Sequence, residues 1–457
     1  MRPLAVVLFL LVAGCAADAP AAERDAAAPE RAGAAAVPLV APTYREPVRL
    51  GLVDHSGAEP TILVTPRVVL VAAAPHLWRS LDGGATFEEL DASALEGFHG
   101  DVDLAADARG TIYYLGLDQG RSTPFQRSTD DGLTWSAPTD LADGRQTDRQ
   151  WIDARADGTL YVNWRDQDDA TDALLFRRSL DGGDTWDPPV AVAPDTIHGP
   201  LAHDAATDAV YFAYYEEGLR VARSADGGAT WSHHVVTREA RDMTLRSGRP
   251  IDMFPVVAVD AAGALYLAWA ADAPDAPLGA KEATISRVWL AVSTDRGATW
   301  TEPRALSPER QTSLFPWVVA GAPGRIAVAW YEARAGAPGH LFPDVWDVVL
   351  AQSVDATSAD PTFLAGHANR DPVHVGAMCR SGGGCDRLCS DATRGCLPTR
   401  VCELGMCFGK VRSRAEFFEM ALTPDGYPIV AWVADARAPD VGIEIHVGGI
   451  ASGTPLR

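Results

Sequence analysis

The sequence of 457 residues predicts an all-β fold, a β-propeller built from four-stranded antiparallel blades. Three observations lead to this prediction. A short motif recurs at intervals of 45 to 69 residues, paired segments of alternating apolar and polar residues precede it, and no stretch within the repeats has a helical period. We expect seven blades, with six as the alternative.

The motif reads Ser-X-Asp-X-Gly-X-Thr followed by Trp or Phe. Five complete copies begin at Ser80, Ser128, Ser179, Ser224 and Ser293, and a decayed copy begins at Ser353. Its Asp carboxylate and its hydroxyl groups can bond to nearby backbone N–H groups, its Gly permits a positive φ, and its aromatic residue can fill the gap between blades. We therefore assign a structural role to the six motif aspartates, Asp82, Asp130, Asp181, Asp226, Asp295 and Asp355.

The segment before each motif has the pattern of two strands around a turn. Residues 257–260 and 265–269 flank an Ala-Ala-Gly turn, and residues 420–426 and 429–432 repeat the arrangement near the C-terminus. Each unit thus supplies strands A and B, a strand C that ends in the motif, and a strand D. The last unit has residues 443–447 as strand C but lacks strand D, which residues 48–53 could supply to close the ring.

These motifs resemble the Asp-box (BNR) repeat of the sialidase superfamily, in which the boxes sit on the rim away from the active site. The resemblance implies a sialidase-like propeller over residues 46–457. It also implies, for an active enzyme, three arginines around a substrate carboxylate, a Tyr nucleophile with a Glu partner, and an Asp acid. The Arg-Ile-Pro motif of the family is missing, since residues 64–67 read Val-Thr-Pro-Arg, and no tyrosine matches the nucleophile motif.

Functional residues of a propeller are expected where the strands nearest the axis begin. Arg149, Arg249 and Arg414 occupy equivalent places in three blades, beside Asp148, Asp252 and Glu416. These six are the catalytic candidates. Further polar residues at such positions are His99, Asp101, Asp153, His198, His203, Tyr331, Glu332, Arg334 and Glu419.

Two interpretations of these residues remain open. Arg and Asp side chains can pair with each other inside a polar channel without any chemistry, which favours a module that binds a ligand, a glycan or a protein. Alternatively, the arginines form a cluster on the axial face of an exo-sialidase or another glycoside hydrolase.

The N-terminus carries an export signal. Residues 1–15 comprise a charged start, a short apolar run and a Val-Ala-Gly-Cys segment that resembles a bacterial lipobox, so Cys15 is the expected lipidation site. Residues 16–45 are rich in Ala and Pro and predict a disordered tether. We expect a lipid-anchored protein of the cell envelope; Ala16, in place of an acidic residue, favours the outer membrane.

Six further cysteines lie within residues 379–407. An even number in an exported chain predicts three disulfides in a small insert that interrupts the approach to the last blade. The cysteines are Cys379, Cys385, Cys389, Cys396, Cys402 and Cys407, and Cys379–Cys385 is the pairing we expect. A metal site is the alternative, although no Cys-X-X-Cys pair is present.

The composition of the chain limits the kinds of partner that it can bind. The net charge of −22 argues against binding to nucleic acid. Acidic loops at residues 165–172 and 272–275 could hold Ca²⁺ through oxygen ligands, but neither has EF-hand spacing, so we expect no cofactor or metal. A monomer with a glycan or an extracellular protein as partner is expected.

Overall fold

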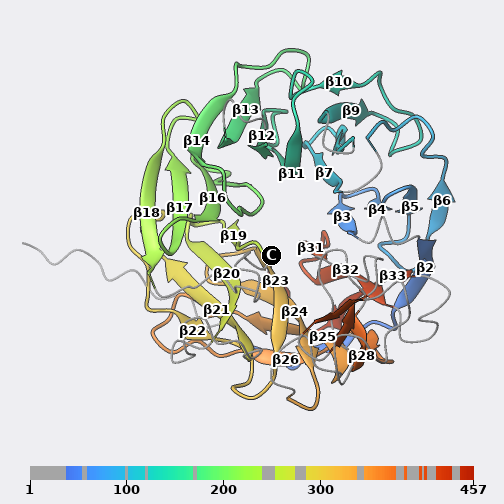
Figure 1. Cartoon of the computed structure of the whole chain (residues 1–457), viewed down its shortest axis with the longest axis vertical. Coiled ribbons are helices and arrows are strands. Elements are labelled where there is room, and N and C mark those ends of the chain that lie inside the picture. Colours follow the sequence, from blue (N-terminus) through green and yellow to red (C-terminus); the bar gives the residue numbers. More distant parts are fainter. Residues whose placement is uncertain are drawn as a thin grey trace, which may run out of the picture. The chain divides into compact units, whose positions relative to one another are not determined.

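Seven antiparallel sheets surround a common axis in the computed structural model of this chain (Figure 1). The prediction of seven four-stranded blades is confirmed, and the alternative of six is wrong. The structure describes residues 38–53, 59–97, 101–118, 122–167, 172–238, 253–272, 285–336, 344–376, 385–388, 401–403, 406–408, 418–434 and 443–457.

The first four blades follow one another along the chain. Blade 1 contains β3 (Thr61–Val64), β4 (Val69–Ala73), β5 (His76–Ser80) and β6 (Glu88–Leu90). Blade 2 contains β7 (Asp103–Ala106), β8 (Ile112–Leu115), β9 (Pro124–Ser128) and β10 (Thr139–Asp140). Blade 3 contains β11 (Thr147–Ala154), β12 (Leu160–Asp166), β13 (Ala173–Ser179) and β14 (Val190–Pro194). Blade 4 contains β15 (Ala202–His203), β16 (Val210–Tyr215), β17 (Leu219–Ser224) and β18 (Ser232–Thr237).

The last three blades complete the ring. Blade 5 contains β19 (Val256–Val259), β20 (Leu265–Asp272), β21 (Ser286–Ser293) and β22 (Arg304–Ala305). Blade 6 contains β23 (Ser313–Ala320), β24 (Ile326–Ala333), β25 (Asp344–Ser353) and β26 (Leu364–His367), and β27 (His374–Gly376) also pairs with β25. Blade 7 contains β31 (Glu419–Leu422), β32 (Pro428–Ala434), β33 (Ile443–Ser452), β2 (Val48–Val53) and β1 (Thr43–Tyr44).

The first strand of each blade lies nearest the axis, and the chain then moves outward. β3 packs against β7 on one side and β31 on the other, so the innermost strands of neighbouring blades meet (Figure 1). The third strand of each of the first six blades ends at a motif serine, as the repeat predicts.

The two ends of the chain close the ring together. β2 pairs antiparallel with β33, with Val48 opposite Val447, so residues 48–53 supply the missing outer strand as predicted. β1 extends the same edge, with Thr43 opposite Ser452. The sheet therefore begins before residue 46, because Thr43 and Tyr44 already pair with the C-terminal strand.

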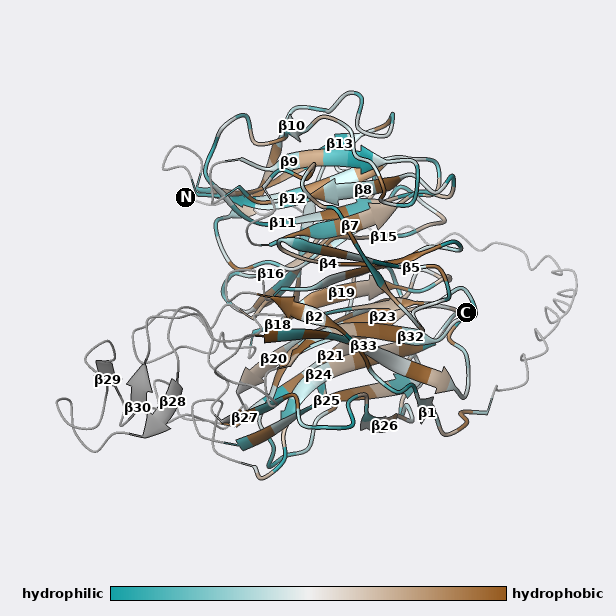
Figure 2. Cartoon of the chain, turned by 90° about the vertical axis from the view of Figure 1, so that its right-hand side faces the viewer, coloured by the Kyte–Doolittle hydropathy of each residue, from teal (hydrophilic) through white to brown (hydrophobic). Residues whose placement is uncertain are grey.

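The core consists of apolar residues on both faces of every blade. Trp164, Trp269, Trp330 and Trp432 occupy the same position in the second strand of four blades, and each is at most 2% exposed. Figure 2 shows hydrophobic residues concentrated in the strands and hydrophilic residues in the turns. Both faces of a blade pack against neighbours, which explains why the strands are more continuously apolar than strands with one solvated face.

Each Asp box is a hydrogen-bonded turn. In blade 4, Asp226 Oδ1 accepts from the Ser224 hydroxyl at 2.8 Å and from the Thr230 backbone N–H at 2.9 Å, and the Thr230 hydroxyl donates to Oδ2 at 2.6 Å. These bonds to the charged form, chiefly that from the Thr230 hydroxyl, lower the pKa of Asp226 to about 2. Asp82, Asp130, Asp181 and Asp295 accept the same three bonds. The boxes are thus part of the fold itself.

The decayed box keeps only part of this pattern. Asp355 accepts from the Ser353 hydroxyl at 2.8 Å and from the backbone N–H of Thr362 at 2.9 Å, across a longer turn. In two of the intact boxes the aromatic residue reaches a ring of the preceding blade, as expected: Trp186 lies edge-on to Phe125 of blade 2 at 5.2 Å. Trp231 lies edge-on to Phe176 of blade 3 at 5.0 Å.

A separate three-stranded sheet lies within the cysteine-rich insert. It comprises β28 (Cys385–Leu388), β30 (Met406–Phe408) and β29 (Val401–Glu403), in that order, and Cys402 is the register partner of Cys407. The side chains of this sheet lie outside the described part of the chain, as do Cys379, Cys389, Cys396 and Cys15, so the disulfides and the lipidation stay predictions. Among the described residues there is no helix, and accordingly none that is long and apolar enough to cross a membrane.

Candidate ligand-binding face

The two ends of the propeller differ in how completely they are described. All turns between first and second strands, and all Asp-box turns, belong to the described residues. Apart from residues 1–37, the segments outside the described residues connect a second strand to a third, or the last strand of one blade to the next blade. Arg249, Asp252, Arg414, Glu416 and His99 lie in such connections, outside the described residues.

Asp148 lies in an ion-pair network at the start of blade 3. Its Oδ2 accepts from Arg165 Nη1 at 3.2 Å and from the amide of Gln167 at 3.1 Å. Arg165 also binds Asp195 in bidentate fashion, at 2.7 and 2.8 Å. The guanidinium of Arg165 on β12 is thus shared by Asp148 of β11 and Asp195, which directly follows β14, an arrangement that orders this part of the face.

Arg149 is buried beside aromatic rings. It lies in a β-bulge of β11 with φ of +54°, is 4% exposed, and stacks its guanidinium over Phe254 at 5.7 Å. Phe254 in turn lies edge-on to Trp151 at 5.0 Å, and Trp317 completes the cluster at 6.0 Å from Trp151. Blades 3, 5 and 6 thus contribute to an aromatic cluster whose cation is Arg149.

His198 lies close to this network and is fully buried. Burial, together with the positive charges of Arg165 and Arg149, lowers the pKa of His198 to about 3, so the ring is neutral. Neither ring nitrogen has a hydrogen-bond partner among the described residues. A permanently neutral imidazole of this kind cannot act as a proton donor near pH 7.

A pair of buried carboxyl groups lies at the innermost strands of blades 7 and 2. Glu419 Oε2 accepts from the Thr61 hydroxyl at 2.6 Å and the Ile62 backbone N–H at 3.1 Å. Asp103 Oδ2 accepts from the backbone N–H of Ile152 at 2.8 Å. Each carboxyl group thereby accepts a hydrogen bond from a backbone N–H on the innermost strand of the next blade. That edge of the strand has no neighbouring strand with which to pair. Burial raises the pKa of both groups, and the charge of Asp103 raises that of Glu419 further.

Asp153 and His203 form an ion pair between blades 3 and 4. The distance from His203 Nδ1 to Asp153 Oδ2 is 2.7 Å. Burial alone would lower the pKa of His203, but the Asp153 carboxylate outweighs burial and raises it. Asp101, another candidate, uses its backbone carbonyl to accept from the Gln150 amide at 2.6 Å.

The candidates of blade 6 are also engaged. Arg334 forms a bidentate pair with Asp347 at 2.5 and 2.7 Å. Glu332 accepts from the Trp330 indole at 2.9 Å, and burial raises the pKa of Glu332. Tyr331 is fully buried, its hydroxyl accepts from the Val433 N–H at 3.2 Å, and burial raises its pKa. A tyrosine in this state is poorly placed to act as a nucleophile.

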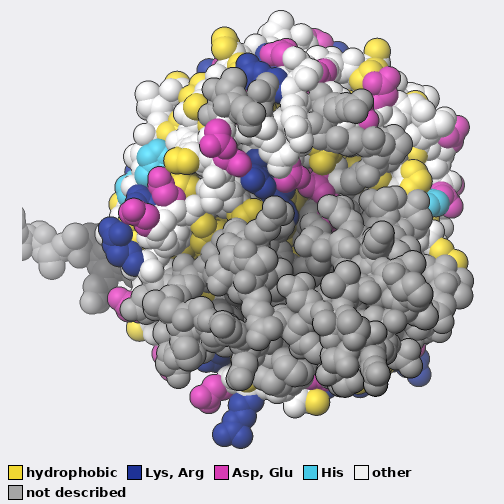
Figure 3. All heavy atoms as spheres, viewed as in Figure 1, with side chains coloured by type: hydrophobic (Ala, Val, Ile, Leu, Met, Phe, Trp, Pro, Cys, Tyr) yellow, Lys and Arg dark blue, Asp and Glu magenta, His cyan; other side chains and the backbone are white. Residues whose placement is uncertain are grey.

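Charges of both signs lie next to one another on the face turned toward the viewer in Figure 3. Among the described residues, no three His, Cys, Asp or Glu side chains are placed to hold a metal ion. Half of the first acidic loop considered for Ca²⁺, residues 168–171, and most of the second, residues 273–275, fall outside that part of the chain.

The fold and its boxes define the class of structure: the described residues form a seven-bladed β-propeller in which the third strands of the first six blades lead into Asp-box turns, the sixth of them decayed. Residues 104–328, which run from blade 2 into the second strand of blade 6, match the model of the BNR repeat-like domain family. No curated protein matches the chain significantly.

Several solved structures are similar to this chain. An ulvan lyase of polysaccharide lyase family 25 has 12% identity and a TM-score of 0.49, covering 89% of this chain and 93% of its own. A Penicillium chrysogenum α-L-arabinanase complexed with arabinobiose has 14% identity and a TM-score of 0.43, covering 89% and 98%. YCF48 bound to D1 peptide has 14% identity and a TM-score of 0.44, covering 90% and 97%. These likenesses do not bear on function.

The sequence pattern missed Asp103 and Thr61, which the structure places with Glu419. The sequence offered one signal for this site, a polar residue at the first position of an innermost strand. That signal identified Glu419, but in blade 2 it was assigned to Asp101, two residues before Asp103. The contacts among Glu419, Thr61 and Asp103 join blades 7, 1 and 2, and only closure of the ring brings these three blades together.

Proposed function

We propose that this chain is a lipid-anchored envelope protein whose propeller binds a glycan through its axial face without cleaving it. One observation carries this proposal: Asp148 is held by Arg165 and Gln167, while Arg149 is buried against Phe254. Groups engaged in this way orient a surface but have little freedom to transfer protons or to attack a substrate. A protein ligand is the alternative outcome.

The mixture of charges supports a hydroxyl-rich ligand. Sugar hydroxyls donate to carboxylates and accept from guanidinium groups, so a face with both signs interspersed can bond them. A carboxylate-bearing sugar would need a cluster of arginines free of acidic partners. Arg165, which donates to Asp148, instead binds two carboxylates.

Binding should depend on Asp148. On an array of neutral and acidic glycans, full-length protein is expected to be retained by at least one glycan, and Asp148→Asn is expected to weaken retention about tenfold, since it removes a charged hydrogen-bonding partner. Asp360→Asn, on an exposed carboxylate beside Arg304, is the matched control and should leave retention unchanged. Retention of no glycan, or equal losses in both variants, would count against the proposal.

Membrane attachment should depend on Cys15. Replacement by serine removes the thiol to which lipid is attached, and acyl chains contribute about 0.8 kcal/mol per buried methylene to membrane binding. Cys15→Ser is therefore expected to move the chain from the detergent-rich to the aqueous phase in a Triton X-114 partition. Ala17→Ser, which adds the same hydroxyl two residues later, should stay in the detergent phase. An unlipidated wild-type chain in the same experiment would refute the anchor.

A further inference from the structure

The end of the propeller that carries the Asp boxes also receives the N-terminal segment. The third strand of blade 7 ends at Ser452, in the place where the third strands of the first six blades lead into boxes. The Pro38 carbonyl accepts from the Thr454 hydroxyl at 2.9 Å, and the Thr43 hydroxyl lies 2.7 Å from that of Ser452. Figure 2 shows β1 and the C-terminus on the same side of the ring. The chain that precedes Pro38 therefore joins the propeller at its box end.

Exposed apolar side chains are concentrated at this end. Seven large ones are exposed in the described part of the chain, and four of the seven lie at the box end. We call these four the apolar rim: Val40, Leu81, Leu133 and Leu180. Leu81 and Leu180 are each 65% exposed and directly follow a motif serine, while Leu133 is 52% exposed and directly precedes a motif threonine. A leucine makes no hydrogen bond within the turn, so the box itself requires none at either place.

The apolar rim lies on one side of the ring. Arg45, next to β1, donates from Nη1 to the Gly83 carbonyl of the first box at 2.8 Å. The first three boxes then follow one another, because the innermost strands of blades 1, 2 and 3 are neighbours. In blades 4 and 5 the place of Leu81 is taken by Ala225 and Thr294, a small and a polar residue. The apolar rim thus begins where the N-terminal segment enters and ends at blade 3.

The charges of these three boxes disfavour an anionic partner. Arg67 pairs with Asp131 of the second box, and Arg127 pairs with Asp184 of the third, each at 2.6 Å. Hydrogen bonds, chiefly from the motif threonine hydroxyl, lower the pKa of the three motif aspartates, Asp82, Asp130 and Asp181. These carboxylates are therefore ionised at neutral pH, and a surface without net negative charge suits the boxes better than an anionic one.

The chain before Pro38 limits how far the box end can lie from a membrane. This step rests on the lipid anchor at Cys15 that is proposed above. As a random coil, residues 16–37 would span about 26 Å. A domain the size of residues 38–457 is about 55 Å across. An anchored tether is thus shorter than the propeller is wide, so the end where it enters stays nearest the bilayer.

We propose that the apolar rim docks on the zwitterionic surface of the bilayer that holds the lipid anchor. The leucines enter the boundary between headgroups and acyl chains, where their apolar area is removed from water. Docking directs the opposite end of the propeller, with the axial face and Asp148, away from the membrane. A glycan can then reach that face without passing between the protein and the bilayer.

A fluorescent probe at two equivalent box positions tests this contact. Leu180→Cys and Ala225→Cys each place a thiol-reactive NBD group directly after a motif serine, the first within the apolar rim and the second outside it. Full-length protein is reconstituted into vesicles of phosphatidylethanolamine and phosphatidylcholine that contain doxyl-labelled lipid, and wild type treated with the same reagent gives the background. Quenching in Leu180→Cys is expected to be at least about threefold that in Ala225→Cys, since only the first probe replaces a side chain that is removed from water.

A second comparison separates the leucines from the position of the tether. In labelled Leu180→Cys, the further changes Leu81→Ser and Leu133→Ser should reduce quenching at least about threefold, because they remove apolar area from the contact. Thr294→Ser, in the box of blade 5, should leave quenching unchanged.

Flotation of the vesicles reports the anchor separately. A chain that does not float with the vesicles refutes the lipid anchor, and the docking with it. A chain that floats, but is quenched equally at the two probe positions or equally with and without the two leucines, overturns the docking alone. A second copy of the chain covering the apolar rim would also contradict the proposal, because it would keep the doxyl lipid away from the probe in Leu180→Cys.

Discussion

Replacement of Gly228 by alanine is expected to destabilise the propeller by about 3 kcal/mol, from overpacking together with a left-handed backbone. Gly228 is the second glycine of the box in blade 4 and has φ of +93°. A Cβ atom there would lie 1.9 Å from Cε1 of Phe176 in blade 3. Phe176 cannot move aside easily, because it is 2% exposed and Trp231 packs against its ring at 5.0 Å.

A glycine of another box separates the two causes. Gly83 also has a left-handed conformation, with φ of +72°, but nothing lies within 4 Å of the place where its Cβ would be. Gly83→Ala should therefore cost only the backbone part, about 1 kcal/mol. Denaturant unfolding of the two variants measures the difference. Equal losses of stability would mean that the box of blade 4 does not pack against blade 3 as the structure has it.

Replacement of Asp103 by asparagine is expected to stabilise the protein at pH 8 and to weaken its pH dependence. The native pKa of Asp103 is raised by burial, whereas an aspartate in the unfolded chain keeps its ordinary value of about 4. Between these values the native state binds more protons than the unfolded state, so the free energy of unfolding falls as the pH rises. We expect the wild type to lose on the order of 2 kcal/mol between pH 5 and pH 8, at about 1.4 kcal/mol per unit of pKa difference.

Asparagine removes the charge at almost the same volume, although its single oxygen can accept from only one of the two backbone N–H groups, of Ile152 and Leu104, that donate to Asp103. Its Oδ1 can still accept from the Ile152 N–H, and Glu419 loses a like charge nearby. Asp360→Asn changes the net charge equally but at an exposed position, so it should keep the wild-type slope. Unfolding free energies at several pH values give the slopes. Identical slopes for the two variants would show that the Glu419–Asp103 pair does not titrate as argued.

The sequence was sufficient to predict the ring because its signals are local and repeated. A box of eight residues marks the end of the third strand, and its bonds, such as Asp226 with Thr230, lie within five residues. Closure was predictable for a different reason. The final unit lacked an outer strand, and residues 48–53 were apolar enough to supply it. A blade of four strands therefore required the pairing of β2 with β33.

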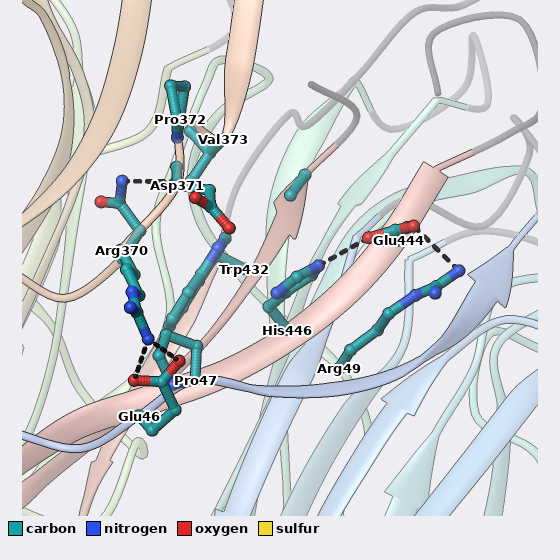
Figure 4. A pocket seen from close by; sticks show the side chains of 12 residues that line it. Glu46, Pro47, Arg49, Arg370, Asp371, Pro372, Val373, Trp432, Glu444 and His446 are labelled. Atoms are coloured by element: carbon teal, nitrogen blue, oxygen red, sulfur yellow. Dashed lines mark hydrogen bonds and ion pairs between the residues drawn. The ribbon is translucent and has the colours of Figure 1, made fainter. Parts of the chain in front are cut away.

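The candidate sites were less predictable because they depend on contacts between distant segments. A pocket lined by Glu46, Arg370 and Glu444 joins three segments far apart in the chain, and their sequence neighbourhoods carry no motif (Figure 4). Asp148 was recognised as polar and near the axis, but its engagement with Arg165, its register partner on β12, was not predicted, nor that Arg165 also binds Asp195. Arg149 was predicted to face a substrate. In the structure it lies in a bulge of β11, and its guanidinium stacks on Phe254. The contacts that these side chains make depend on how segments of the chain pack together, and the residue type alone does not determine them.

The most direct test of binding without cleavage is to incubate full-length protein with α2,3- and α2,6-sialyllactose and with any neutral glycan it retains, and to analyse the products by mass spectrometry. The account predicts intact glycans after prolonged incubation, in the wild type and in Asp148→Asn alike. Release of sialic acid or of a shorter glycan by the wild type, and its loss in Asp148→Asn, would contradict the account and make the axial face a hydrolase site.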